Sequence, residues 1–129
     1  MPREPHEGLT RRERQIMDVL FRSGKATVAD VMDQMPDPPS YSAVRATLRV
    51  LEEKGRVLHQ QDGPRYVYVP AVPAETARSA ALHHLVNTFF DGSAERAVAA
   101  LLQLDDANVS ETDLARLSAL VKRARDEGR

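Results

Sequence analysis

The sequence predicts a mainly helical protein with one short β-hairpin, in which residues 1–72 form one domain and residues 73–129 form a second. Two observations predict this arrangement. Six segments carry apolar residues at the helical period, and each is bounded by a capping Ser or Thr, by Gly or by Pro. Between residues 56 and 69 the pattern changes to the alternation that is typical of strands.

Composition and charge exclude several classes of protein. A chain of 129 residues with 42% hydrophobic and 29% charged residues is typical of a folded soluble protein. It has no cysteine, so disulfides, thiolate metal sites and a catalytic thiol are excluded. No apolar run approaches the roughly 20 residues that cross a bilayer, and the N-terminus lacks the apolar core of a signal peptide, so we expect a cytoplasmic protein. The net charge of −1 neither requires nor excludes a nucleic-acid partner.

Two helices are predicted before residue 40. Thr10 and Glu13 have the spacing of a capping box, and Thr27 is placed to cap the second helix with Asp30 at its third position. The first helix ends before a glycine and the second at a proline, and residues 25–26 between them are expected to pair as a short strand. The inward-facing positions are Ile16, Met17, Leu20, Phe21, Val28, Val31, Met32 and Met35.

A third helix is predicted from its cap at Ser40 to Gly55, and it has two different faces. Its apolar face consists of Val44, Thr47, Leu48 and Leu51. Its opposite face consists of Ser42, Arg45, Ala46 and Arg49, with Glu53 further along. Small residues allow a helix to approach a duplex closely while guanidinium groups reach guanine edges or phosphates, so this face is typical of a DNA-reading helix. Taken alone, two arginines are also compatible with an ordinary solvated surface.

A β-hairpin is predicted directly after this helix. Residues 56–60 and 65–69 alternate as strands, and residues 61–64 are typical of a turn. Arg65, next to the turn, is the expected phosphate contact, whereas Tyr66 and Tyr68 are expected to pack rather than to stack on bases. Because a short turn joins the second helix to the third and the hairpin follows as a wing, the first domain is predicted to be a winged helix-turn-helix.

The pattern across these elements resembles one protein family. It comprises an LT-x2-E start, a Tyr-Ser pair before Val44, an L-x2-LEEKG close and a hairpin that ends in Tyr-x-Pro. In this combination the chain resembles the penicillinase-repressor family of bacterial regulators, the BlaI/MecI/CopY group, over nearly its whole length. The resemblance implies a homodimeric repressor that binds palindromic operator DNA through its third helix, with the wing on the DNA backbone. It also implies a membrane sensor protease that triggers cleavage of the repressor, although no residue identifies the cleavage site. The copper-responsive branch uses C-terminal cysteines that this chain lacks, so copper sensing is not implied.

The second domain is predicted to consist of three helices with more apolar surface than they can bury alone. The first stops at Gly92, Ser93 caps the second, and Ser110 opens the third with Asp113 at its third position. Because roughly 55 residues make a marginal isolated domain, we expect dimerisation, with packing back onto the first domain as the alternative. The residues expected at the dimer interface are Leu82, Leu85, Phe89, Leu114, Leu117, Leu120 and Val121.

No pattern in the chain indicates an enzyme, a metal site or a cofactor. His83 and His84 are adjacent, so on a helix they point about 100° apart and cannot share a metal ion. His6 and His59 are isolated, neither lies near a serine with an acidic partner, and the glycines form no phosphate-binding loop. We therefore expect no catalytic residue, no metal and no cofactor.

Two functions of different classes remain. In the first, the protein is a sequence-specific transcriptional repressor. Its expected DNA contacts are base edges for Ser42, Arg45, Ala46 and Arg49, and phosphates for Ser40, Tyr41 and Arg65. In the second, it is a winged-helix adaptor whose third helix packs on a protein partner, which the near-neutral charge permits. Arg45 and Arg49 discriminate between the two, because only DNA reading requires both guanidinium groups.

Overall fold

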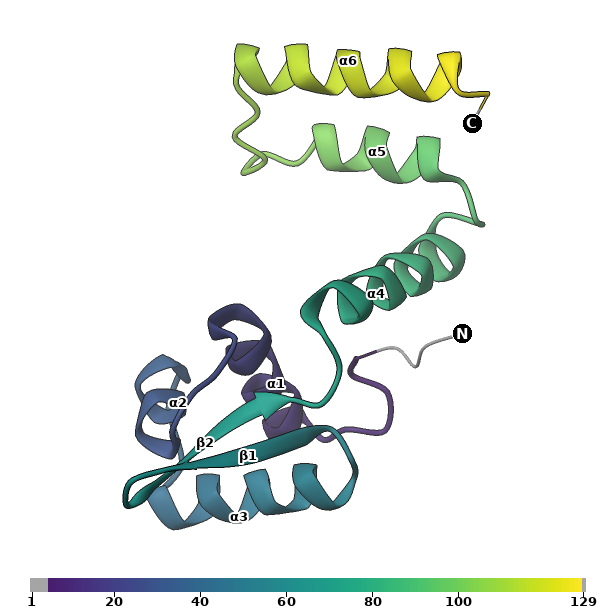
Figure 1. Cartoon of the computed structure of the whole chain (residues 1–129). Coiled ribbons are helices and arrows are strands. Elements are labelled where there is room, and N and C mark those ends of the chain that lie inside the picture. Colours follow the sequence, from purple (N-terminus) through teal and green to yellow (C-terminus); the bar gives the residue numbers. More distant parts are fainter. Residues whose placement is uncertain (1–4, 129) are drawn as a thin grey trace. The chain divides into compact units, whose positions relative to one another are not determined.

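The computed structural model describes residues 5–128 and confirms a mainly helical fold (Figure 1). Within these residues, six helices and one antiparallel hairpin follow one another along the chain. The N-terminal elements are α1 (Arg11–Ser23), α2 (Val28–Gln34), α3 (Tyr41–Glu53), β1 (Val57–Asp62) and β2 (Arg65–Pro70). The C-terminal elements are α4 (Ala74–Phe89), α5 (Ala94–Leu102) and α6 (Glu111–Asp126).

The chain divides into two compact units, and the division falls inside α4. The first unit extends to Leu85 and holds α1, α2, α3, the hairpin and most of α4, whereas the second begins at Val86 and holds α5 and α6. The domain boundary expected from the sequence, between residues 72 and 73, lies just before α4 and stays a prediction. No helix within residues 5–128 is long and apolar enough to cross a membrane.

Five helices begin at the capping residues that the sequence indicates, and three of these caps are complete capping boxes. The pairs that form complete capping boxes are Thr10 with Glu13, Thr27 with Asp30, and Ser110 with Asp113. In the second box, hydrogen bonds from the backbone and the side chain of Thr27 lower the pKa of Asp30. Each box satisfies backbone N–H groups that the first helical turn leaves without partners, which is why the starts of these helices are confirmed.

A glycine terminates α3 as predicted. Gly55 has a φ of +75°, in the left-handed region that residues with a Cβ atom rarely adopt. The N–H of Gly55 donates to the carbonyl of Glu52 at 3.0 Å, and the N–H of Arg56 donates to the carbonyl of Leu51 at 2.9 Å. This pair of hydrogen bonds is a Schellman motif, and it turns the chain directly into β1.

The core of the first unit lies between α1, α2, α3 and the hairpin. The side chains without exposed surface are Leu20, Val31, Val44, Leu48, Leu51 and Val57. The apolar face predicted for α3 is confirmed at three of its positions, whereas Thr47 is only half-buried and its hydroxyl donates to the carbonyl of Ala43 at 2.9 Å. Phe21 and Met32 are partly buried and pack against the edge of this core.

The hairpin is tighter than the sequence suggests. Its register pairs Asp62 with Arg65, so β1 continues two residues beyond the predicted end and only residues 63–64 form the turn. Ala26 and Tyr68 exchange two backbone hydrogen bonds of 2.8 and 3.0 Å, so the short strand predicted at residues 25–26 is reduced to a bridge at Ala26. Three helices followed by this hairpin form a winged helix-turn-helix, in which α3 directly precedes the wing (Figure 1).

Candidate nucleic-acid interface

The outward face of α3 carries the side chains that are predicted to read DNA. The residues of this face, called the reading face below, are Ser42, Arg45, Ala46 and Arg49. All four are exposed, because the apolar side of α3 is held in the core and fixes the rotation of the helix. Together with Tyr41 they line one shallow hollow on the surface. The structure therefore brings the predicted base-contacting residues together.

Ser40 and Tyr41 lie at the N-terminal end of α3. The Oγ atom of Ser40 accepts a hydrogen bond from the backbone N–H of Ala43 at 3.1 Å, so this residue is the helix cap. A hydroxyl group that accepts one bond can still donate its own hydrogen, so Ser40 can cap the helix and contact a phosphate at once. Tyr41 is 54% exposed.

A cavity of about 350 Å³ lies between the start of α2, α3 and the hairpin. Arg45 from α3 and Arg65 from β2 both line it, together with Tyr41 and Tyr66. Guanidinium groups on two different elements therefore reach one hollow, and a planar fork of N–H donors is suited to a phosphate group. This cavity connects the reading face to the wing.

Arg65 shares the tip of the wing with a carboxylate. Its Nη2 atom lies 3.8 Å from Oδ2 of Asp62, and the two side chains are 66% and 69% exposed. An ion pair with this exposure is weak, because water screens both charges. A DNA phosphate can therefore replace Asp62 as the partner of Arg65.

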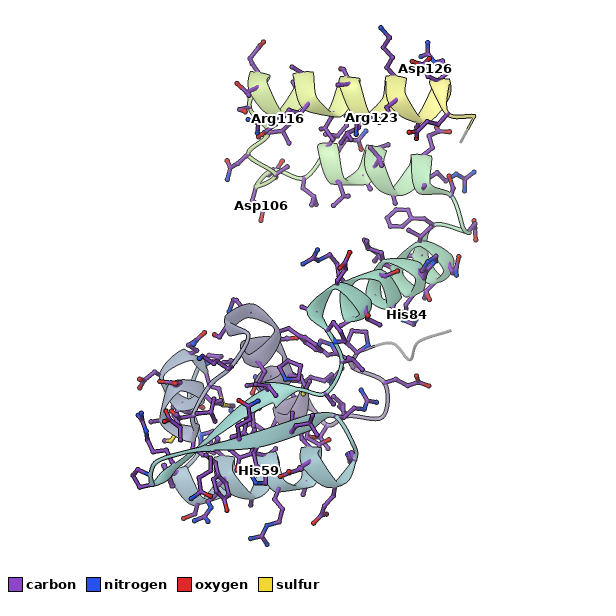
Figure 2. The ribbon with its side chains drawn as sticks, in the orientation of Figure 1. His59, His84, Asp106, Arg116, Arg123 and Asp126 are labelled. Carbon is purple, nitrogen blue, oxygen red and sulfur yellow. The ribbon has the colours of Figure 1, made fainter. Side chains whose placement is uncertain are left out.

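A link between α3 and the wing was not foreseen from the sequence. His59 of β1 lies 2.6 Å, measured from its Nδ1 atom, from Oε2 of Glu52 on α3 (Figure 2). The imidazole ring also stacks on Tyr66, with ring centroids 4.4 Å apart. The only signal in the sequence is the alternation of β1, which puts His59 on the same face as the buried Val57.

The two tyrosines of β2 have different surroundings. Tyr68 is buried, and its pKa is raised by burial and by the carboxylate of Glu52. Its packing role is confirmed. Tyr66 is 41% exposed, but its ring stacks on His59 and meets the ring of Tyr68 edge-on with centroids 6.4 Å apart, so the expectation of a packing residue holds for it in part.

The C-terminal end of α3 is tied to α1 by an ion pair. Lys54 is the C-cap residue of α3, and its Nζ atom contacts Oε1 of Glu13 at 2.8 Å and the carbonyl of Gly8 at 3.3 Å. Burial of Glu13 opposes its ionisation, but the hydrogen bonds from Lys54 and Thr10 outweigh this effect and lower the pKa of Glu13. The Glu13 carboxylate is therefore ionised and bound at neutral pH.

Most of the residues that are predicted to form a dimer interface are exposed in the single chain. The exposed fractions are 53% for Leu82, 38% for Leu85, 70% for Phe89, 46% for Leu114, 51% for Leu120 and 60% for Val121. Leu117 is half-buried. Leu82 and Leu85 belong to the first unit, and the other five residues belong to the second.

The histidines of α4 do not form a metal site with other residues of the described chain. His83 and His84 are both exposed, and within residues 5–128 no three His, Asp or Glu side chains are grouped so that they could hold one metal ion (Figure 2).

The comparison with protein families gives one match. The model of the penicillinase repressor family matches residues 9–123, which include every element from α1 to α5 and most of α6. The chain belongs to the penicillinase repressor family. Because this is a family of transcriptional regulators, the protein is a DNA-binding regulator of transcription and not an enzyme.

Several solved structures are similar to this chain. A possible transcriptional regulator for arsenical resistance is 28% identical, with 76% of this chain and 96% of that chain covered and a TM-score of 0.46. BpsR of Bordetella bronchiseptica is 13% identical, with coverages of 95% and 78% and a TM-score of 0.48. A MarR/EmrR family regulator from Acinetobacter sp. ADP1 is 21% identical, with coverages of 94% and 77% and a TM-score of 0.45. No curated protein matches the sequence.

Proposed function

We propose that this penicillinase repressor family member is a sequence-specific repressor that binds a palindromic operator as a homodimer. The observation that carries the proposal is the reading face of α3. It exposes Arg45 and Arg49 beside two small residues, on a helix whose other side is locked in the core. Membership of the penicillinase repressor family supports the same conclusion.

In this proposal α3 lies in the major groove. Arg45 and Arg49 donate to guanine edges, while Ser42 and Ala46 are small enough to let the helix backbone approach the bases. Ser40 and Tyr41 bind phosphates at the N-terminal end of the helix, and Arg65 binds the backbone along which the wing lies. The cavity between Arg45 and Arg65 is the expected position of one phosphate.

Dimerisation would strengthen binding to DNA. Two subunits place two copies of α3 on two half-sites and double the phosphate contacts of one subunit. We assign the dimer interface to the apolar side chains of α4 and α6. These are Leu82, Leu85, Phe89, Leu114, Leu117, Leu120 and Val121.

The cellular setting is proposed from the family. We assign the protein to the cytoplasm, where operator DNA is accessible. A membrane sensor protease is the proposed partner that relieves repression.

The test begins with duplexes that the wild-type protein selects from a random-sequence library. Affinity for the selected duplex is then measured by mobility shift at several salt concentrations. Replacing both arginines, R45A/R49A, is expected to weaken binding at least about tenfold, because each base contact contributes about 1–3 kcal/mol. The matched control is R14A/R22A on α1, which removes the same charge from exposed positions outside the proposed DNA contacts and the proposed dimer interface.

Three results together support the proposal. They are a selected site with dyad symmetry, a steep salt dependence of binding, and a loss of affinity that is confined to R45A/R49A. Sedimentation is expected to show that wild-type and both variants remain dimers. If the wild-type protein binds no duplex in a salt-dependent manner, DNA reading is excluded and α3 is better explained as a surface for a protein partner.

A further inference from the structure

Glu13 is the one buried charged side chain among the residues that the structure describes, with 4% exposure. Its role as a helix cap does not require this burial. The equivalent acids of the other capping boxes, Asp30 and Asp113, are exposed and half-exposed, respectively, yet their boxes are complete. The difference lies in Lys54, whose ammonium group shares Oε1 of Glu13 with the backbone N–H of Thr10.

This ion pair joins two distant parts of the chain at a defined point. Glu13 lies in the first turn of α1, and Lys54, 41 residues later, is the residue that caps the C-terminal end of α3. Further polar contacts of the same turn run from Glu52 to His59 on the wing and from Arg56 to the carbonyls of Pro5 and Glu7. The end of α3 is thus held from three directions by hydrogen bonds.

A partly buried ion pair is a poor source of stability. Glu13 is taken out of water while the side chain of Lys54 stays 37% exposed, so the cost of burying the carboxylate offsets much of the attraction between the two charges. Hydrogen bonds differ from apolar packing in being directional. The apolar face of α3 decides which side of the helix points inward, whereas the bond from Lys54 to Glu13 limits sliding and rotation of the helix.

Small movements of α3 matter most at the reading face. Arg49 precedes Lys54 by five residues, which is about 7.5 Å along the helix axis, and Arg45 lies about one turn further. Bidentate contacts of guanidinium groups with base edges depend on their direction, whereas contacts with phosphates tolerate displacement.

We propose that the pair formed by Glu13 and Lys54 is a positioning device that sets the register of α3 against α1 and thereby aims Arg45 and Arg49 at the bases. The inference rests on the proposed reading of DNA by α3. Neither Glu13 nor Lys54 contacts DNA in this account, and both act through the helix.

The experiment uses the full-length double variant E13Q/K54M. Glutamine keeps an oxygen that accepts from Thr10, methionine keeps the apolar stem of the lysine, and the net charge of the protein is unchanged. The matched control is D91N/R96M, which removes an exposed ion pair of the second unit, 3.4 Å long, also without a change in net charge. Each protein is measured for its thermal midpoint and for its affinity for the selected duplex and for a scrambled duplex of equal length.

We expect E13Q/K54M to unfold within a few degrees of the wild-type protein. Its affinity for the selected duplex falls about tenfold, the scale of one lost base contact, while its affinity for the scrambled duplex is unchanged. The ratio of the two affinities therefore falls, and the control leaves this ratio at the wild-type value. A single variant, E13Q, serves if the double variant does not fold. Its changed net charge alone would tighten binding to both duplexes alike and leave the ratio unchanged, so a reduced ratio reports the lost ion pair.

Two results overturn the inference. In one, E13Q/K54M keeps both wild-type affinities, which limits the ion pair to a structural role. In the other, affinity for both duplexes falls equally, which makes Lys54 a direct phosphate contact. A wild-type protein without preference for either duplex overturns the proposed function itself, and is recognised before any variant is measured.

Discussion

The tip of the wing provides the sharpest test of how this protein contacts the DNA backbone. Arg65 is proposed to bind a phosphate, but its guanidinium group lies 3.8 Å from the carboxylate of Asp62. Asp62 therefore competes with DNA for Arg65 and also repels the phosphates itself. Replacing Asp62 by asparagine, which keeps its size and its suitability for a turn, is expected to tighten binding.

The expected gain follows from the geometry of the pair. Two unit charges about 4 Å apart attract each other by about 1 kcal/mol in water, and exposed pairs retain about half of this value after screening and side-chain entropy. A dimer contains two wings, so D62N is expected to gain about 1 kcal/mol in total, or about fivefold in affinity. Because the pair is more than 60% exposed, the free energy of unfolding should change by less than about 0.5 kcal/mol.

The assay is fluorescence anisotropy with the selected duplex at low and high salt. The gain should shrink as salt is added, because the Debye length falls from about 10 Å at 0.1 M to about 3 Å at 1 M. D106N, in the loop between α5 and α6, changes the charge equally and is the control (Figure 2). Equal gains for D62N and D106N would show a general charge effect. No gain for D62N would refute the placement of Arg65 at the backbone.

Three further predictions concern stability and assembly. L48A should lower the free energy of unfolding by about 2–5 kcal/mol, because Leu48 is completely buried. Urea denaturation followed by circular dichroism measures this change. A loss below about 1 kcal/mol would contradict the assigned core. The pKa of Glu13 in the folded state lies below its ordinary value of 4.5, so its stabilising contribution is complete above that pH and is lost on acidification. The free energy of unfolding should therefore fall less between pH 6 and pH 3 in E13Q than in the wild-type protein. L120D should dissociate the dimer without unfolding the chain, since Leu120 is 51% exposed in the single chain. If sedimentation still shows a dimer, α6 is not part of the dimer interface.

The fold could be predicted because its signals are local. A capping residue and the acid three positions later decide where α1, α2 and α6 begin, and Gly55 decides where α3 ends. The period of the apolar residues decides which side of α3 is buried, and hence that Arg45 and Arg49 are exposed together. Prediction failed where pairing extends a local pattern, as in β1, which continues to Asp62 because its partner strand offers Arg65 in register.

The polar contacts around α3 could not be predicted from the sequence. His59 and Glu52 are seven residues apart and Lys54 and Glu13 are 41 residues apart, and nothing in their spacing indicates that they meet. The family pattern contains both Glu13, in its LT-x2-E start, and Lys54, in its LEEKG close, but the pattern alone does not say why. The structure does, because it joins these two parts of the pattern by one ion pair.

The sequence by itself determined the helices, the hairpin, the buried sides of α1, α2 and α3, the exposed arginines and the family to which the chain belongs. These properties depend on residues within a few positions of one another, so periodicity and capping specify them. The tertiary structure alone decided that Arg45 and Arg65 line one cavity, that Glu52 holds the wing through His59, and that a buried carboxylate anchors the end of α3. Such distances depend on how whole elements pack, and no local pattern contains them.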